Sequence, residues 1–112
     1  MIKEEALENF KYRISYLIEN KEVGYVILEE TIDVIDIVDV LVNEEYRKQK
    51  IASKLFDYVI NKYKNVKEKI MLEVRVSNNP AINLYRKFNF EIIYIRKNYY
   101  KDEDAYIMEV KL

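Results

Sequence analysis

The fold of this chain is decided by one stretch, Val40-Leu41-Val42-Asn43-Glu44-Glu45-Tyr46-Arg47-Lys48-Gln49-Lys50-Ile51-Ala52-Ser53-Lys54-Leu55-Phe56. An apolar strand is predicted to end at Val42, a polar turn follows, and an amphipathic helix begins near Lys50. Three of the four residues from Arg47 onward are basic. A strand that enters a helix through a cationic turn presents free backbone N–H groups, which favour an anion. The stretch therefore predicts an α/β domain with a phosphate-binding turn.

Length and composition predict one domain and narrow its chemistry. The 112 residues, half of them hydrophobic, suffice for a single packed domain over residues 1–112. Basic and acidic side chains nearly balance, with a net charge of -1, so neither nucleic acid nor an anionic membrane is an expected partner. The sequence contains no cysteine and no histidine, which excludes thiolate nucleophiles, imidazole bases and the common zinc sites. No export signal or membrane span is indicated, so the expected compartment is the cytoplasm.

The first half of the chain is predicted to hold a short helix and three strands. Residues 3–10 are interpreted as a helical turn, because apolar residues recur there at helical spacing. Alternation over residues 12–18 and an apolar run over residues 23–28 predict a hairpin. The strand predicted over residues 31–42 carries three aspartates, each three residues from the next: Asp33, Asp36 and Asp39. Strict pleating would send them to alternating faces, which predicts a bulge near the middle of the strand and disfavours a metal site.

The second half is predicted to hold two helices and three strands. The expected elements are a helix over residues 50–63, a strand over residues 67–76, a second helix, and strands over residues 90–98 and 105–112. Asn79 suits the N-cap of the second helix, Pro80 its first position, and Asn89 a left-handed residue after it. We therefore expect an α/β (α+β) fold with flanking helices and a mixed, mostly antiparallel sheet that splays after Val42.

Two sequence blocks are specific enough to carry a family resemblance. Residues 42–52 resemble a pyrophosphate-binding motif in which Arg or Gln is followed by x-x-Gly-x-Gly/Ala at a helix start. The second block is Leu72-Glu73-Val74-Arg75-Val76-Ser77-Asn78-Asn79-Pro80-Ala81-Ile82-Asn83-Leu84-Tyr85, which continues through Phe88-Asn89-Phe90 and residues 96–100 to residues 104–108. Over roughly residues 10–112 the chain resembles the GNAT-superfamily N-acetyltransferases, and most of all the bacterial ribosomal-protein alanine N-acetyltransferases.

The resemblance implies a single GNAT-like domain that moves acetyl from acetyl-CoA to a primary amine, without a metal. The preferred acceptor is a protein or peptide N-terminus, such as that of a ribosomal protein, and a small-molecule amine is the alternative. By the same resemblance, Glu73 is the general base and Tyr85 the acid that protonates the departing coenzyme A sulfur. Coenzyme A binding is implied for Val40, Leu41, Val42, Arg47, Lys48, Gln49, Lys50, Ile51, Ala52, Ser53 and Asn78.

Taken without the resemblance, these side chains have structural interpretations as well. Glu73 would form one half of a cross-strand ion pair, and Tyr85 would be a core aromatic residue on an apolar helix stripe. Asn78 would cap a local turn, and residues 40–42 would form an ordinary buried strand. The basic residues from Arg47 onward would be solvated or neutralised locally by Glu44 and its neighbour.

Two departures from the family pattern leave another class of function open. Lys50 occupies the position of the glycine that lets the backbone approach the pyrophosphate. The family's usual first strand and first helix are also expected to be missing, so the acceptor site is either more open or completed by a second subunit in a homodimer. A shortened scaffold that binds a partner without catalysis is therefore the alternative to an enzyme.

Overall fold

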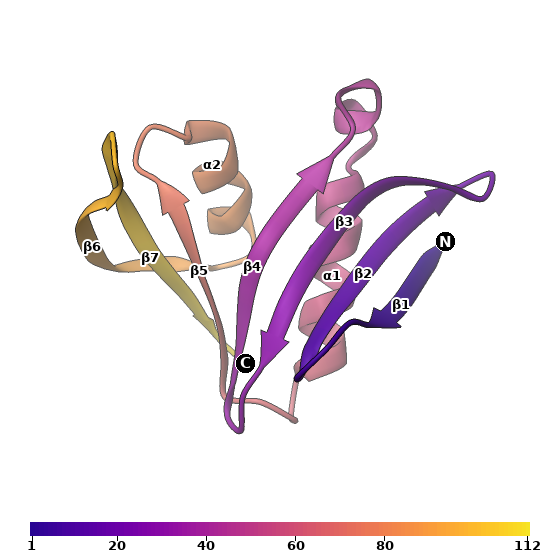
Figure 1. Ribbon diagram of the computed structural model, residues 1–112, viewed down its shortest axis with the longest axis horizontal. Coiled ribbons are helices and arrows are strands. Elements are labelled where there is room, and N and C mark those ends of the chain that lie inside the picture. Colours follow the sequence, from indigo (N-terminus) through magenta and orange to yellow (C-terminus); the bar gives the residue numbers. More distant parts are fainter.

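Seven strands and two α-helices make up the computed structural model, which describes residues 1–112 apart from the side chains of residues 48 and 49. The strands are β1 (Ile2–Ala6), β2 (Lys11–Ile18), β3 (Lys21–Glu30), β4 (Val34–Val42), β5 (Lys69–Arg75), β6 (Glu91–Tyr100) and β7 (Glu103–Lys111). The helices are α1 (Ile51–Tyr63), α2 (Asn79–Lys87) and a preceding 3-10 segment, η1 (Glu44–Gln49). The strands form one sheet in the order β1-β2-β3-β4-β5-β7-β6 (Figure 1).

The sheet is mixed and mostly antiparallel, as predicted, and it opens between β4 and β5. These two strands are parallel and pair only from Val34–Lys69 to Ile37–Leu72, after which they diverge (Figure 1). The prediction that the sheet splays after Val42 was wrong by several residues. The cause is a bulge in β4, since Ile37 pairs with Leu28 and Asp39 with Ile27, which leaves Val38 as an extra residue. A bulge bends its strand and increases the local twist, so the bulge predicted from the aspartate spacing is confirmed.

The N-terminal segment corrects the sequence prediction. Residues 2–6 form the edge strand β1, antiparallel to β2, instead of the predicted helical turn. Leu7 and Phe10 were two of the three apolar residues behind that prediction, and they are 43% and 72% exposed. Pairing with the free edge of β2 provides hydrogen bonds for the backbone of β1. Burying three apolar side chains in a helical turn would stabilise this segment less. Residues 7–10 join β1 to β2 without a helix.

The two helices meet across the opening of the sheet. Helix α1 lies against β2, β3 and β4, and buries five side chains, Ile51, Leu55, Phe56, Val59 and Tyr63. Phe56 also stacks on Tyr85 of α2, with 5.4 Å between ring centroids, and packs against Phe88 and Phe90. Aromatic pairs at this separation contribute about 0.5–1.5 kcal/mol each beyond their burial. The cluster therefore fixes α2 relative to α1 although the strands beneath them have separated.

The start of α2 differs from the prediction by one residue. The N-cap is Asn78, whose side-chain oxygen accepts a hydrogen bond of 3.3 Å from the N–H of Ala81. Asn79, predicted as the cap, is the first helical residue, and Pro80 is the second. Asn78 has a ψ of 72°, which lies outside the helical range, so the helix begins only after it. Asn89 has a φ of 69°, which confirms the predicted left-handed residue after the helix.

Candidate functional site

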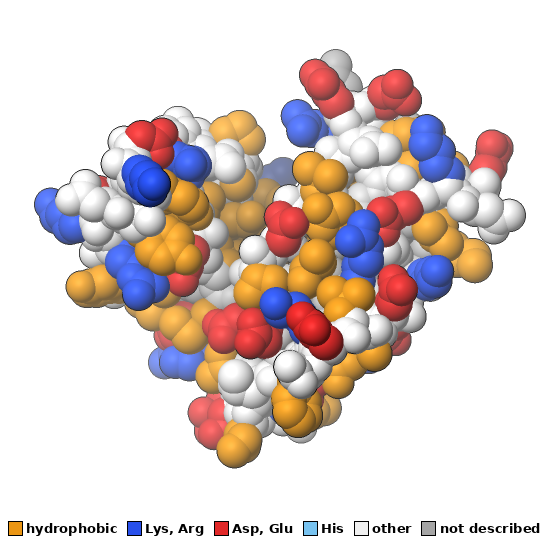
Figure 2. Space-filling model, in the orientation of Figure 1, with side chains coloured by type: hydrophobic (Ala, Val, Ile, Leu, Met, Phe, Trp, Pro, Cys, Tyr) orange, Lys and Arg blue, Asp and Glu red, His pale blue; other side chains and the backbone are white. Residues whose placement is uncertain are grey.

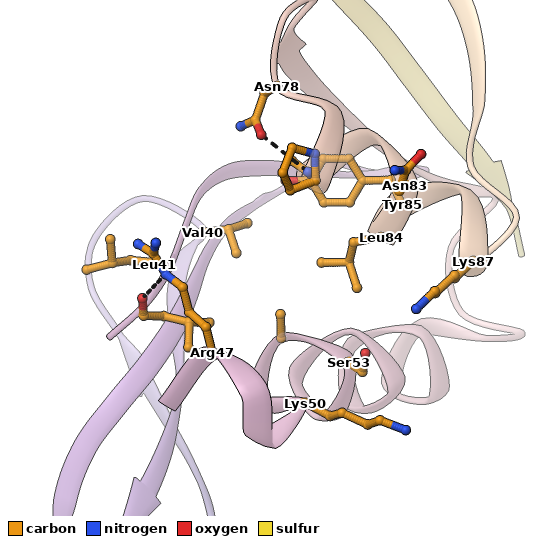
Figure 3. Close-up of a pocket in the computed structure, with 14 residues that line it drawn as sticks. Val40, Leu41, Arg47, Lys50, Ser53, Asn78, Asn83, Leu84, Tyr85 and Lys87 are labelled. Atoms are coloured by element: carbon orange, nitrogen blue, oxygen red, sulfur yellow. Dashed lines mark hydrogen bonds between the residues drawn. The ribbon is translucent and has the colours of Figure 1, made fainter. Parts of the chain in front are cut away.

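A cleft of about 600 Å³ lies between the end of β4, the start of α1 and one side of α2 (Figure 3). We call it the helix-side cleft. Eight of the eleven residues predicted to bind a cofactor line it: Val40, Leu41, Val42, Arg47, Lys50, Ala52, Ser53 and Asn78. The two halves of the molecule are separated by a notch at its upper side (Figure 2). The residues named from the sequence thus lie together around one cleft, although they come from β4, η1, the start of α1 and the N-cap of α2.

The strand wall of the cleft offers backbone groups to an extended ligand. Residues 39–42 of β4 pair with β3 on one side, as in Val40 with Val26, whereas the pairing with β5 has already ended at Ile37. A strand edge of this kind binds extended ligands through main-chain hydrogen bonds. The edge exists because the bulge at Val38 turns β4 away from β5.

The turn before α1 keeps a glycine-like backbone despite its lysine. Lys50 has φ 58° and ψ 33°, in the left-handed region, and α1 begins at the next residue. A non-glycine residue in this conformation costs about 1 kcal/mol. The first N–H groups of α1 lie at the positive end of the helix, and its first turn contains no acidic residue. Arg47 lies at the β4 end of the cleft, where its Nε donates to the Val42 carbonyl at 3.3 Å.

Three of the predicted cofactor residues do not line the cleft with described side chains. Ile51 is only 1% exposed, and its side chain belongs to the core, so only its backbone remains for a ligand. The predictions for Lys48 and Gln49 fall on the side chains outside the described part of the structure.

The two predicted catalytic residues share a second, smaller hollow between the diverging strands. This central hollow has a volume of about 260 Å³ and is lined by Glu73 of β5 and by Tyr85 of α2. Tyr85, Val40 and Asn78 also line the helix-side cleft, so the two spaces share a wall. Tyr85 is 8% exposed, and burial raises its pKa to about 12. Its hydroxyl therefore carries a proton throughout the physiological pH range.

Glu73 lines the central hollow and also a third hollow, which borders it. Its carboxylate forms an ion pair with Arg96 of β6 at 3.4 Å, and hydrogen bonding to Glu73 raises the pKa of Tyr99. The third space, which we call the acidic hollow, has a volume of about 440 Å³, and its lining includes Glu29, Asp36, Glu73, Tyr99 and Tyr100. Burial, followed by the nearby Glu29 and Glu73, raises the pKa of Asp36.

The helix-side cleft, the central hollow and the acidic hollow form a series of spaces in which each shares lining residues with the next. Tyr85 stands at the first boundary and Glu73 at the second. A carboxylate and a hydroxyl that line the same hollow can accept and donate hydrogen bonds in a proton or group transfer.

Sequence reasoning missed part of each wall. In the helix-side cleft it missed Pro80, Ala81, Asn83, Leu84 and Lys87 of α2. Their spacing places them on one side of a helix, which is a usable signal once the start of that helix is known. Beside Glu73 it missed Arg96, which comes from β6 and is distant in sequence.

Over the described side chains, no group of three or more histidine, cysteine, aspartate or glutamate residues is arranged to hold a metal ion. None of the helices in the described chain is long and apolar enough to cross a membrane.

Comparisons with known proteins agree with this geometry. A sequence profile described as the acetyltransferase (GNAT) family matches residues 2–90. An N-alpha-acetyltransferase of Saccharolobus solfataricus is 49% identical over 75 residues, which cover 64% of this chain and 45% of the relative. A candidate ribosomal-protein alanine N-acetyltransferase of Bacillus subtilis is 37% identical over 86% of this chain and 74% of its own length.

A solved structure matches over nearly the whole chain. The ribosomal-protein alanine N-acetyltransferase of Escherichia coli has a TM-score of 0.87 and 28% identity, and the match covers 94% of this chain and 71% of that one. The chain spans about half the length of the archaeal relatives that it matches.

Proposed function

Because this chain belongs to the acetyltransferase (GNAT) family, we propose that it moves an acetyl group from acetyl-CoA to a primary amine, the α-amine of a protein N-terminus. The observation that carries the proposal is the shared lining of the three spaces, with Tyr85 between the helix-side cleft and the central hollow and Glu73 between the central and acidic hollows. The proposed compartment is the cytoplasm.

The helix-side cleft is the proposed binding site for acetyl-CoA. Its diphosphate would lie against the N–H groups at the start of α1, near Arg47 and the backbone of Lys50, where an anion is favoured by the helix dipole. The pantetheine arm would run along residues 40–42, whose backbone groups no longer face β5. Asn78 and Ser53 line the same cleft and are proposed as polar contacts. We also propose that the backbone groups of the same turn contact acetyl-CoA at four further residues, Lys48, Gln49, Ile51 and Ala52.

Glu73 and Tyr85 are the proposed catalytic residues. The amine nitrogen attacks the thioester carbonyl carbon, a C–N bond forms, and the C–S bond breaks. Glu73 accepts the proton that the amine loses. Tyr85 has a pKa of about 12, well above the value of about 8.5 for a thiol, so complete transfer of its proton to the departing thiolate is unfavourable. Its proposed role is to donate a hydrogen bond that stabilises the thiolate, which then takes a proton from solvent.

The acidic hollow is the proposed entrance for the acceptor. Its lining includes Glu29, Asp36 and Glu73, and a positively charged amine is attracted to such a site. The relatives act on protein N-termini by their names, and some of them act on a ribosomal protein. We therefore propose a protein or peptide N-terminus as the partner, with a ribosomal protein as the first candidate. A second subunit at the acceptor site remains a proposal that rests on the family comparison alone.

Acetyl-CoA binding separates an enzyme from a non-catalytic scaffold. The alternative is favoured by Lys50, whose side chain stands where the family has glycine. Isothermal titration calorimetry with acetyl-CoA should show saturable binding, because the lysine retains the left-handed turn. Absence of binding at millimolar ligand would leave only the scaffold.

The acceptor class is tested by mass spectrometry with paired peptides. A peptide that starts with alanine and carries a free α-amine should gain one acetyl group, whereas the same peptide with a blocked N-terminus and an internal lysine should gain none. Acetylation of the blocked peptide at the same rate, or of a small amine alone, would replace the proposed acceptor.

Substitution of Tyr85 tests its proposed role in the chemical step. Tyr85→Phe removes the hydroxyl but keeps the ring that stacks on Phe56. We expect kcat to fall roughly 10- to 100-fold, because one hydrogen-bond donor to the developing charge is lost. The affinity for acetyl-CoA, measured by calorimetry, should change little. Unchanged kcat would remove Tyr85 from the mechanism.

Substitution of Glu73 tests the base at the other boundary. Glu73→Gln keeps the size of the side chain but cannot accept the amine proton, so we expect a fall in kcat of about 100-fold or more near neutral pH. The loss should be partly recovered at alkaline pH, where a larger fraction of the acceptor amine is already deprotonated. Steady-state rates between pH 6 and 9.5 measure both effects, and equal loss at every pH would argue for a positioning role instead.

A further inference from the structure

We propose that Lys50 and Lys87 form a second phosphate subsite in the helix-side cleft, which binds the 3′-phosphate of coenzyme A. This inference rests on the proposed function, since it takes coenzyme A as the occupant of the cleft. It adds that the protein distinguishes coenzyme A from its 3′-dephospho form.

The two lysines reach the same end of the cleft from different helices. Lys87 belongs to the last turn of α2, and Lys50 immediately precedes α1. Both line the helix-side cleft. Lys87 extends from α2 toward α1, and Lys50 runs beside the start of α1 toward the same end (Figure 3). Ser53 and Asn83 line the cleft as well and add a hydroxyl and an amide to its wall.

The described charged side chains that line the cleft are all positive. Its described lining contains three cationic residues, Arg47, Lys50 and Lys87, and no aspartate or glutamate. Among the described side chains, neither lysine forms an ion pair with a carboxylate. Arg47 lies apart from them, where its Nε contacts the Val42 carbonyl at the β4 end of the cleft (Figure 3). Lys50 and Lys87 therefore each add to the cleft a positive charge that no described carboxylate neutralises.

The chemistry of the ligand calls for such a site. Coenzyme A carries a diphosphate and, separately, a 3′-phosphate monoester with a charge of about −1.5 to −2 at neutral pH. The N–H groups at the start of α1 can serve one anionic group, and Lys and Arg side chains serve another as charged donors. Lys50 thus keeps the backbone conformation of a glycine and supplies a cation that a glycine lacks.

Binding of two matched ligands tests the subsite. Calorimetry would compare coenzyme A with 3′-dephospho-coenzyme A for the native chain, Lys50→Gln, Lys87→Gln and the double variant. We expect the native chain to bind coenzyme A about tenfold more tightly than the dephospho form, and each single variant to lose roughly threefold for coenzyme A alone. The double variant should bind both ligands with nearly equal affinity.

Lys54→Gln is the matched control because it removes the same charge from the first turn of α1, close to Lys50 in the chain. The Lys54 ammonium lies 5.2 Å from the Tyr16 ring centroid and donates to the Tyr16 hydroxyl at 3.4 Å, and Lys54 is not part of the cleft lining. The Lys54→Gln variant should prefer coenzyme A over 3′-dephospho-coenzyme A by the same factor as the native chain. A native chain that binds both ligands equally would overturn the subsite and leave the proposed function standing. A native chain that binds neither ligand at millimolar concentration would overturn both.

Discussion

At the scale of single residues, Lys50 combines a strained backbone with a charge that the cleft can use. Its left-handed conformation is one that glycine adopts freely, so Lys50→Gly should raise the free energy of unfolding by about 0.5–1 kcal/mol. The same change should weaken coenzyme A binding, because the cation is lost. Urea denaturation and calorimetry on one sample measure the two effects. A variant that is less stable than the native chain would show that the lysine side chain holds the turn in place.

Gly24 lies where a Cβ atom would come too close to neighbouring residues. A Cβ there would lie 3.0 Å from Ile51 Cγ2, 3.2 Å from the Leu41 carbonyl oxygen and 3.3 Å from Val42 Cγ2. These are the residues that position the end of β4 and the start of α1. Gly24→Ala should therefore destabilise the protein by about 1–3 kcal/mol through overpacking and also weaken acetyl-CoA binding.

The control for Gly24 is Lys21→Ala on the exposed start of the same strand. It should change the free energy of unfolding by no more than about 0.5 kcal/mol. Equal effects of the two substitutions would mean that the close approach at Gly24 is relieved by small shifts.

Residue identities were predictable where a motif fixed their type, and not where the contact was tertiary. Glu73 and Tyr85 were singled out from one block of sequence, residues 72–85, and both line the central hollow in the structure. Lys87 was missed, although its spacing from Pro80 and Leu84 places it on one side of α2 once the start of that helix is known. Arg96 was missed because its contact with Glu73 spans two neighbouring strand pairings, β5 with β7 and β7 with β6.

At the scale of elements, the N-cap of α2 links stability to the site. Asn78 accepts a hydrogen bond from the N–H of Ala81, and it lines both the cleft and the central hollow. Asn78→Ala should lower the free energy of unfolding by about 1 kcal/mol, whereas Asn79→Ala should have a much smaller effect. Asn78→Ser should preserve stability, because serine also caps helices.

The measurement is a denaturation curve for each of the three variants, followed by acetyl-CoA titration of Asn78→Ser. If Asn79→Ala is as harmful as Asn78→Ala, the cap assignment is wrong. Asn79 was predicted as the cap because Asn-Pro is a common helix start. The position of the cap within one residue depends on the ψ angle of Asn78, which the sequence does not specify.

Strands and helices were predictable to the extent that their periodicity was long. The amphipathic pattern of α1 and the alternation of β2 run over many residues, and both elements were predicted correctly. β1 was not, because its identity depends on pairing with β2 and not on its own five residues. The bulge at Val38 was predicted because three aspartates could not share one face of a buried strand.

At the scale of the whole molecule, the opening of the sheet is made possible by packing between the helices. The strands β4 and β5 separate after four paired residues, yet Phe56 and Tyr85 keep α1 and α2 in contact above the gap. Tyr85 thus has a structural role and a proposed catalytic one. The sequence predicted a splayed sheet, but the aromatic cluster that spans it depends on residues from two helices and was not predictable.

Burial of two tyrosines makes the stability of the whole molecule sensitive to alkaline pH. Burial raises the pKa of Tyr63 and of Tyr85 to about 12, above the value of about 10 in an unfolded chain. A group whose pKa is higher in the folded state contributes stability that is complete below the unfolded pKa and is lost as pH rises toward the folded pKa. The free energy of unfolding should therefore fall by roughly 2–3 kcal/mol per tyrosine between pH 10 and pH 12.

Urea denaturation at a series of pH values from 8 to 11.5 measures this loss, and Tyr63→Phe and Tyr85→Phe assign it. Each variant should show a shallower decline than the native chain, because phenylalanine has no proton to lose. Tyr99→Phe is the control, since Tyr99 is 45% exposed and its ionisation is less opposed by burial. A native chain whose stability stays constant up to pH 11.5 would show that the folded protein admits both phenolates, and that water reaches Tyr85 from the cleft it lines.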